Sequence, residues 1–453
     1  MGDGLGSLLL MPHRANFLDP VTRSWVILVS GSVVRMTLGF LASVLIARAL
    51  GPAEFGVYVL LGAVSNIASA LADFGLSDAA VKRVAEAWAR DPHTAPERGQ
   101  AFFWTRIGVT GLVVAVGILL SGPLSERIFS LSQRHSAVAA PCLLSLAFLG
   151  VAATALSGAM STLLQATGRF GWVSVVMLTN AGLTALLAVI LALAGRLTLI
   201  SALVVLGIGT SVASFLTGLY LLPREWRPSL QDRNTLQVEG RYLLGFGCWL
   251  GLANMFAVLT AYLDVFLVNR WSAAATVGAY GLALNLASKV DVVNNSLYMV
   301  LLPVASALDQ TKHIFGAYVR RCLLHSVGVS FALLPLILLA RPFILFFYGP
   351  AYTPAIGFFQ GLLSVVIFDV FTLPLLLLAY PLNQPKLLTV GDALRVLTLA
   401  LIATWLTPIY GPSGAVLGKF AAKAVGAVLT LAVIFRILCR ASPGQAQRSD
   451  PSG

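Results

Sequence analysis

Apolar runs of about 20 residues, separated by short polar segments, follow one another along the whole chain. Each run is long enough to cross the ~30 Å hydrocarbon core of a bilayer as an α-helix. The alternating segments of ~10 residues that are typical of a transmembrane β-barrel do not occur. We therefore predict an all-α polytopic membrane protein with about twelve transmembrane helices. The predicted spans are about 24–47, 55–76, 102–122, 137–163, 172–194, 197–222, 242–268, 276–301, 322–340, 354–381, 387–408 and 412–435.

The turn between the first two spans returns half a chain later. "RALGPAEFGVYVLLGAV", which starts at Arg48, has the same frame as "RWSAAATVGAYGLALNLA", which starts at Arg270. The matched residues are Arg48, Gly56 and Tyr58 in the first stretch and Arg270, Gly278 and Tyr280 in the second. Two halves of six spans enter the membrane in the same direction because six is even. The pattern predicts two parallel six-helix repeats.

This repeat divides the chain into two bundles. The predicted parts are a cytoplasmic N-terminal tail (1–23), a first bundle (24–222) that includes a cytoplasmic amphipathic linker (77–100), a second linker (223–241), a second bundle (242–435) and a disordered tail (436–453). In the first linker, Val81, Val84 and Trp88 share one helical face and basic residues occupy the other, as in helices that lie on a membrane surface.

Composition and charge support the membrane assignment. Hydrophobic residues make up 58% of the 453 residues and charged residues only 11%, too few to cover a soluble protein of this length. The net charge of +12 comes mainly from Lys and Arg in segments on the side of the N-terminus. The positive-inside rule then predicts that both termini are cytoplasmic, and the basic balance does not indicate nucleic-acid binding.

Charged residues inside the predicted spans are the strongest functional signal. Each costs about 2.5–3.5 kcal/mol near the centre of a bilayer, so they should face one another or a water-filled cavity. The cations are Arg35, Lys289, Arg395, Lys419 and Lys423, and the acids are Asp264, Asp291, Asp369 and Asp392.

Spacing indicates local pairing for one of these groups. Asp392 and Arg395 are three residues apart on one predicted helix and can neutralise each other. Lys289 and Asp291 are two residues apart and point in different directions.

Three cations have no acid on their own helix. Lys419 and Lys423 are four residues apart and share a face, and Arg35 is the one charge of the first span. They indicate a pathway for an anion. The alternative is that they pair with acids of neighbouring helices, such as Asp264 or Asp369.

The sequence shows no enzymatic constellation. The five histidines have no metal-ligand spacing, the four cysteines are scattered singly, and no Gly-rich loop with a Lys could cradle phosphate. We predict no enzymatic activity, no cofactor and no metal.

The stretch "ARALGPAEFGVYVLLGAVSNIASALADFGLSDAAVKRVAE" (47–86) resembles the opening of polysaccharide-export and Wzx-type flippases for lipid-linked oligosaccharides. These belong to the MOP superfamily, which also includes the MATE multidrug extruders and the lipid II flippase MurJ. The resemblance implies a central cavity that opens alternately to each side of the inner membrane. It implies transport of a polyprenyl-diphosphate-linked glycan from the cytoplasmic to the periplasmic leaflet.

The same resemblance implies a cationic lumen, for which Arg35 and Lys289 occupy plausible positions. Arg395, Lys419 and Lys423 are further candidates for substrate binding, and the four acids for coupling or ion pairing. Expected partners are the lipid-linked glycan, membrane lipids, and the polymerase and glycosyltransferases of the same pathway. Two other functions stay open: a cation-coupled multidrug exporter of the same superfamily, and a membrane-embedded glycosyl or acyl transferase.

Overall fold

Helices form all the regular structure in the part of the chain that the computed structural model describes, which is residues 20–129, 139–229, 233–294, 296–298, 312–377 and 385–440. The elements are α1 (Pro20–Asp73), α2 (Leu76–Arg90), α3 (Ala95–Leu119), α4 (Ser121–Phe129), α5 (Ala139–Ala166), α6 (Phe170–Leu193), α7 (Leu199–Ser201), a π-helical run (Ala202–Gly209), α8 (Thr210–Leu221), a 3₁₀ turn (Arg224–Trp226), α9 (Arg233–Trp271), α10 (Ala274–Val290), α12 (Lys312–Tyr348), a second 3₁₀ turn (Pro350–Tyr352), α13 (Ala355–Leu377), α14 (Pro385–Tyr410) and α15 (Pro412–Arg440).

The number of membrane crossings agrees with the prediction of about twelve. Ten helical segments among the described residues are long and apolar enough to span a bilayer. The first of these contains two crossings, because Gly51 has a φ of 70° and interrupts α1 between residues 20–50 and 52–73. Glycine adopts this left-handed conformation without steric penalty. The shorter helix α10 completes the twelve.

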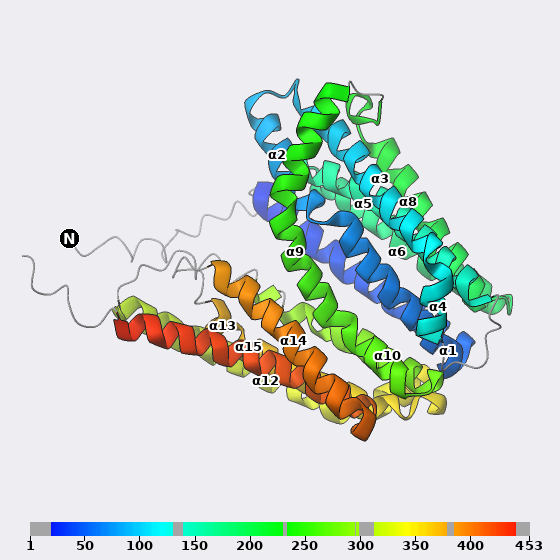
Figure 1. Cartoon of the computed structure of the whole chain (residues 1–453), viewed down its shortest axis with the longest axis vertical. Coiled ribbons are helices and arrows are strands. Elements are labelled where there is room, and N and C mark those ends of the chain that lie inside the picture. Colours follow the sequence, from blue (N-terminus) through cyan, green and yellow to red (C-terminus); the bar gives the residue numbers. More distant parts are fainter. Residues whose placement is uncertain are drawn as a thin grey trace, which may run out of the picture.

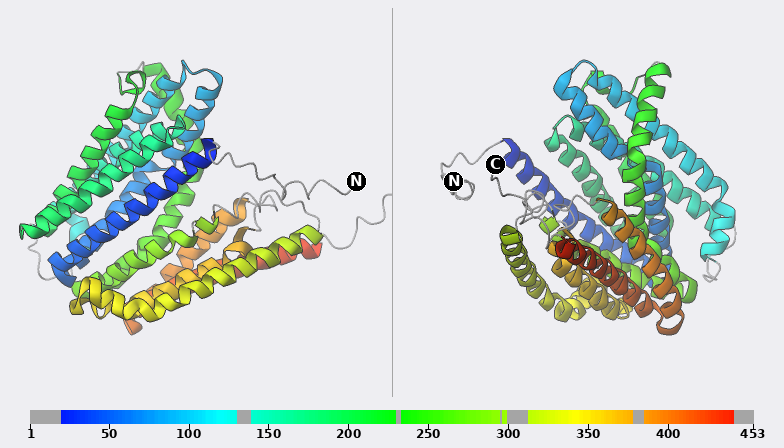
Figure 2. Two further views of the ribbon diagram at one scale, coloured as in Figure 1. Left: turned by 180° about the vertical axis from the view of Figure 1, so that it is seen from behind. Right: turned by 60° about the vertical axis from the view of Figure 1, so that its left-hand side comes forward.

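The helices form two arms of a V (Figure 1). Helices α1 to α8 and the first part of α9 make one arm, and α12 to α15 make the other. The arms meet where the kink of α1, the end of α9 and α10 lie together. They diverge toward the side that holds the beginning of α1 and the end of α15 (Figure 2). The expected two-bundle architecture is confirmed. The V opens on the side that holds the beginning of α1 and the end of α15.

The repeated motif lies at the closed end of the V. A Cβ atom on Gly56 would collide with the carbonyl oxygen of Ala274 and lie 2.9 Å from the backbone nitrogen of Gly278. A Cβ atom on Gly278 would collide with the carbonyl oxygen of Pro52 and lie 3.0 Å from the nitrogen of Gly56. The two matched glycines therefore let equivalent helices of the two repeats cross backbone against backbone. This contact explains why the same glycine position occurs in both halves.

Hydrogen bonds reinforce this closed end. Arg48 donates from Nη2 to the carbonyl oxygen of Phe346 at 2.6 Å. The hydroxyl of Tyr352, which is buried, donates to the carbonyl oxygen of Ala47 at 2.7 Å. Both bonds join α1 to the second arm just before the Gly51 kink.

Both predicted linkers contain helical segments. Helix α2 buries small residues such as Ala79, Ala80 and Val84 and packs against α3, α5 and α9, so it is part of the first arm. Residues 95–100 already belong to α3. The last part of the 223–241 linker is helical, because α9 begins at Arg233.

A cluster of charges fastens α9 to the first arm. The Glu239 carboxylate accepts hydrogen bonds from Nε and Nη2 of Arg83, both at 3.0 Å, and lies 3.5 Å from Nε of Arg98. Glu239 is only 7% exposed. This carboxylate therefore links α9 to α2 and α3 in one place.

Replacing Glu239 by Gln is expected to lower the free energy of unfolding by about 1–3 kcal/mol, because a bidentate charged pair is lost from a half-buried site. Thermal unfolding of the purified protein in detergent measures the change. Glu54→Gln is the control, since Glu54 is exposed and should shift the midpoint little. Equal midpoints for the two variants would contradict a stabilising role for the cluster.

Candidate functional site

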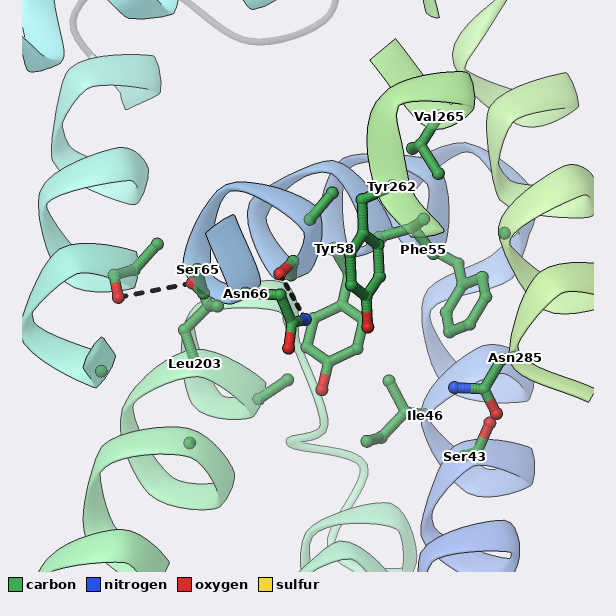
Figure 3. A pocket seen from close by; sticks show the side chains of 18 of the residues that line it. Ser43, Ile46, Phe55, Tyr58, Ser65, Asn66, Leu203, Tyr262, Val265 and Asn285 are labelled. Carbon is green, nitrogen blue, oxygen red and sulfur yellow. Dashed lines mark hydrogen bonds between the residues drawn. The ribbon is translucent and has the colours of Figure 1, made fainter. Parts of the chain in front are cut away.

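One cavity of the described structure lies near the vertex of the V. It has a volume of about 610 Å³ and is lined by α1, α5, α6, the π-helical run, α9 and α10. A volume of this size is typical of sites for small organic ligands, about 300–1,000 Å³. We call it the central cavity (Figure 3).

Neutral polar side chains give the central cavity its chemistry. Tyr58 from α1 and Tyr262 from α9 line it, as do Asn66 and Ser65 (Figure 3). Asn66 donates from Nδ2 to the carbonyl oxygen of Gly62 at 2.8 Å, which holds its amide group in place on α1. Hydroxyl, amide and aromatic groups together can bind a polar but uncharged ligand by hydrogen bonds and stacking.

None of the described residues that line the central cavity is charged. The sequence analysis expected cations to coat the lumen, and the structure places the five cations elsewhere. Three of them form ion pairs, and two lie toward the open end of the V. Whether a cation forms an ion pair depends on which acidic residues the tertiary structure brings close to it.

Lys419 forms a buried ion pair with an acid of another helix. Its Nζ lies 2.7 Å from Oδ2 of Asp264, which is fully buried on α9, and it also donates to the carbonyl oxygen of Ala261 at 3.0 Å. The hydroxyl of Tyr280 donates to the same carboxylate. A charge removed from water in this way is stabilised only by such direct partners.

Lys423 has the equivalent arrangement one turn further along α15. Its Nζ lies 2.6 Å from Oδ2 of Asp369 on α13, and Asn294 donates to the same oxygen from Nδ2 at 2.8 Å. Asp291 lies at the edge of this group, 3.4 Å from the Asn294 amide nitrogen. Pairing of the two lysines with Asp264 and Asp369 is the alternative that the sequence analysis left open.

These groups border a second cavity of about 260 Å³, which we call the charged cavity. Lys419, Lys423, Asp291 and Asp369 line it. It shares Ser288 and part of the α9 wall with the central cavity, so the two are neighbours.

Arg395 and Asp392 form the local pair that their spacing predicted. Nη1 of Arg395 lies 3.0 Å from Oδ1 of Asp392 on the same turn of α14. This pair lines neither the central nor the charged cavity.

Arg35 and Lys289 differ from the other three cations. The ion pairs found among the described residues include Arg395, Lys419 and Lys423 but neither Arg35 nor Lys289. Arg35 is exposed and Lys289 is half-buried, and they lie close enough for their like charges to interact. Arg35 lies on α1 in the first arm and Lys289 on α10, where the arms meet, and two cations without an acidic partner among the described residues attract an anion.

The position of this cation pair relates it to the central cavity. One face of α1 carries Arg35, Gly39 and Ser43 at four-residue steps. Gly39 and Ser43 line the central cavity. On α10, Asn285 lines the cavity and Lys289 lies four residues further on. Ser288, which directly precedes Lys289, also lines the cavity, so the two cations lie at its edge, toward the open side.

Lys289 also lines a third, apolar pocket of about 420 Å³, formed by α1, α10 and α12. Its other walls are hydrophobic or weakly polar, such as Phe40, Leu339 and Phe343. A fixed positive charge thus adjoins a pocket that suits a hydrocarbon chain.

The sequence analysis missed one buried charge pair. Arg106 on α3 is 8% exposed and pairs with Asp73 at the end of α1, while also donating to the hydroxyl of Ser77. Arg106 lies near the beginning of the predicted span 102–122 and is not among the charges expected deep in the membrane. It also missed the neutral residues of the central cavity, because Ser, Asn and Tyr do not stand out in an apolar span.

The described residues contain no group of three or more His, Cys, Asp and Glu side chains that could hold a metal ion.

Solved structures with this arrangement of helices are transporters. The fold matches a structure of the lipid II flippase MurJ in an inward closed conformation, with a TM-score of 0.72 and 12% identity over 90% of this chain and 87% of that chain. It also matches an inward-facing multidrug resistance MATE transporter of the MOP superfamily, with a TM-score of 0.66 and 14% identity over 91% of this chain and 99% of that chain. The protein is therefore a multi-pass membrane protein with the fold of the MOP-superfamily transporters.

Sequence relatives narrow this class. The model of the polysaccharide biosynthesis protein family matches residues 21–309, more than half of the chain, and the chain belongs to that family. Stage V sporulation protein B of Bacillus subtilis is 32% identical over 109 residues, which are 24% of this chain and 21% of that protein. The match thus spans about a fifth of the length of this curated relative. The resemblance predicted from residues 47–86 is confirmed at the level of the family.

Proposed function

We propose that this protein moves a polyprenyl-diphosphate-linked oligosaccharide across the inner membrane by alternating access, from the cytoplasmic to the periplasmic leaflet. The observation that carries the proposal is that Arg35 and Lys289 lie beside the central cavity without an ion-pair partner among the described residues, and that Lys289 also lines an apolar pocket. Such a substrate has three chemically different parts: an anionic diphosphate, a polar glycan and a hydrocarbon chain.

The diphosphate is the part that Arg35 and Lys289 would bind. Cations that are partly shielded from water and free of acidic partners bind phosphate oxygens through charge-assisted hydrogen bonds. Arg35 lies on α1 and Lys289 on α10, so a bound diphosphate would bridge these two helices. A ligand held in this way can drive a change of conformation, provided that the two conformations hold it unequally.

The hydrocarbon chain and the glycan would occupy the neighbouring pockets. The apolar pocket of α1, α10 and α12 adjoins Lys289 and suits a prenyl chain. The central cavity, which is polar, suits the glycan. The sugar would then cross the bilayer in a polar cavity while the chain stays in an apolar environment.

The conformation supports an opening toward the cytoplasm. The V opens on the side that holds the beginning of α1 and the end of α15. The positive-inside rule predicts that this side is cytoplasmic. The TM-score is 0.66 against the inward-facing MATE transporter and 0.55 against an outward-facing one. Rocking of the arms about the closed end would expose the central cavity to the other side.

The three paired cations have a different role in this proposal. Lys419 and Lys423 hold α15 to α9 and α13 through buried ion pairs, and Arg395 pairs within α14. Of the five cationic candidates, Arg35 and Lys289 therefore stay as substrate-binding residues. Asp264 and Asp369 act as partners of the lysines. The enzymes that assemble the glycan would supply the substrate, and a polymerase would consume it.

The test is transport of a fluorescent polyprenyl-diphosphate disaccharide by the full chain in proteoliposomes. Arg35→Gln and Lys289→Gln together should lower the rate at least about tenfold, because each removes a charge-assisted contact worth roughly 1.5–3 kcal/mol. Arg196→Gln, a change at an exposed cation in the turn after α6, should leave the rate unchanged.

Transport by the double variant at the rate of the parent protein would overturn the role of these cations. Absence of transport by the parent protein, together with binding of organic cations, would favour the multidrug exporter instead.

A further inference from the structure

We infer that the sugars which enter the central cavity are uncharged, so that this transporter selects glycans without acidic groups near the lipid carrier. The inference rests on the proposed function and adds the chemical class of the substrate. The observation behind it is that none of the described residues that line the central cavity is charged, although the predicted spans contain eleven charged residues.

The walls of the central cavity have the groups that bind neutral sugars. Hydroxyl and amide side chains such as Ser43, Asn66 and Asn285 can both donate to and accept from sugar hydroxyls. Tyr58 and Tyr262 add aromatic rings, whose electron-rich faces attract the weakly positive C–H bonds of a pyranose. Figure 3 shows these residues arranged around one space.

An acidic sugar would find no counter-charge in this cavity. A carboxylate that leaves water without an ionic partner loses hydration that neutral hydrogen-bond donors replace only in part. Lys419 and Lys423, which line the adjoining charged cavity, are already held by Asp264 and Asp369 at 2.7 and 2.6 Å. Asp291 adds a further carboxylate to the wall of the adjoining charged cavity. The surroundings therefore disfavour a second anion.

The cations that are free lie at a different level. Arg35 is one helical turn from Gly39 on α1, and Lys289 directly follows Ser288 on α10; both Gly39 and Ser288 line the central cavity. The structure thus places these two cations at the edge of the central cavity, toward the open side, and neutral side chains deeper in the molecule. This order matches a substrate in which the diphosphate carries the charge and the adjoining sugars carry none.

The experiment compares two probes on the purified full chain. Both are short-chain polyprenyl diphosphates, one carrying a hexose–N-acetylhexosamine disaccharide and the other the same disaccharide with a hexuronic acid in place of the hexose. The parent protein should bind the neutral probe about tenfold more tightly than the acidic probe, the effect of one unpaired polar group.

A lysine introduced into the wall of the central cavity should weaken or reverse the preference for the neutral probe. Asn285→Lys places a positive charge in the wall of the central cavity, one turn from Lys289. It should reduce or reverse the preference for the neutral probe over the acidic probe. Ser43→Lys does the same from α1 and serves as a second variant if the first does not fold. Ser32→Lys, on α1 but outside the cavities described above, should leave the preference unchanged.

The outcomes separate this inference from the proposed function. Equal or tighter binding of the acidic probe by the parent protein overturns the inference and leaves a lipid-linked glycan as the substrate. Binding of neither probe overturns both.

Discussion

Replacing Asp264 by Asn is expected to destabilise the protein by roughly 3–5 kcal/mol, the usual cost of leaving one member of a buried ion pair without its partner. Asp264 is fully buried, accepts a hydrogen bond from Tyr280 and neutralises Lys419. The variant retains the shape of the side chain and removes only its charge, which leaves an ammonium group inside the protein. Thermal and denaturant unfolding of the purified protein in detergent would measure the loss.

A double-mutant cycle separates the ion pair from its surroundings. Lys419→Met alone leaves the carboxylate unpaired and should also be destabilising, whereas Asp264→Asn combined with Lys419→Met should be more stable than either single variant. Asp392→Asn is the control, because the side chain of Asp392 is 32% exposed and its pair with Arg395 should contribute less than about 1 kcal/mol. Additive effects of the two single changes would show that the pair does not couple α9 to α15.

Gly278→Ala is expected to open the sealed end of the V. The added methyl group would collide with the carbonyl oxygen of Pro52, which is backbone and cannot rotate away. The clash should cost the sealed conformation about 1–3 kcal/mol, a change of roughly 5- to 150-fold in the ratio of sealed to open molecules. Gly56→Ala should act in the same way, because the contact is reciprocal.

Labelling with a membrane-impermeant thiol reagent reports this change. Ser65→Cys places the thiol in the central cavity, in a chain whose four native cysteines are replaced. Reagent added on the sealed side should react faster in the Gly278→Ala variant than in the parent. Gly357→Ala is the matched control, since no atom lies within 4 Å of a Cβ at that position. Unchanged labelling in the Gly278→Ala variant would show that the glycine crossing does not seal the cavity.

Much of the fold could be predicted from local properties of the chain. The crossings follow from hydropathy, because an apolar run of sufficient length satisfies its backbone hydrogen bonds only as a helix in the bilayer. The repeat was visible in the spacing of Gly56 and Gly278. That the two glycines touch each other was not, because a contact between helices depends on how the halves pack.

The candidate site shows the same division. The cost of burying charge predicted that Lys419 and Lys423 need either water or an acid, and it left both possibilities open. Lys419 and Lys423 pair with acids because Asp264 and Asp369 lie next to them in the folded protein. These acids are distant in the sequence and reach the lysines only through the packing of α9, α13 and α15.

The sequence by itself determined the class of protein, the number of crossings, the two repeats and the need to pair or hydrate each intramembrane charge, because these depend on the hydrophobicity and order of residues along one chain. Only the tertiary structure decided which cations are neutralised and which are free to meet a ligand, since charges are balanced between helices. It also decided that the central cavity is neutral, because a cavity wall is assembled from single residues of many helices and leaves no pattern in any one of them.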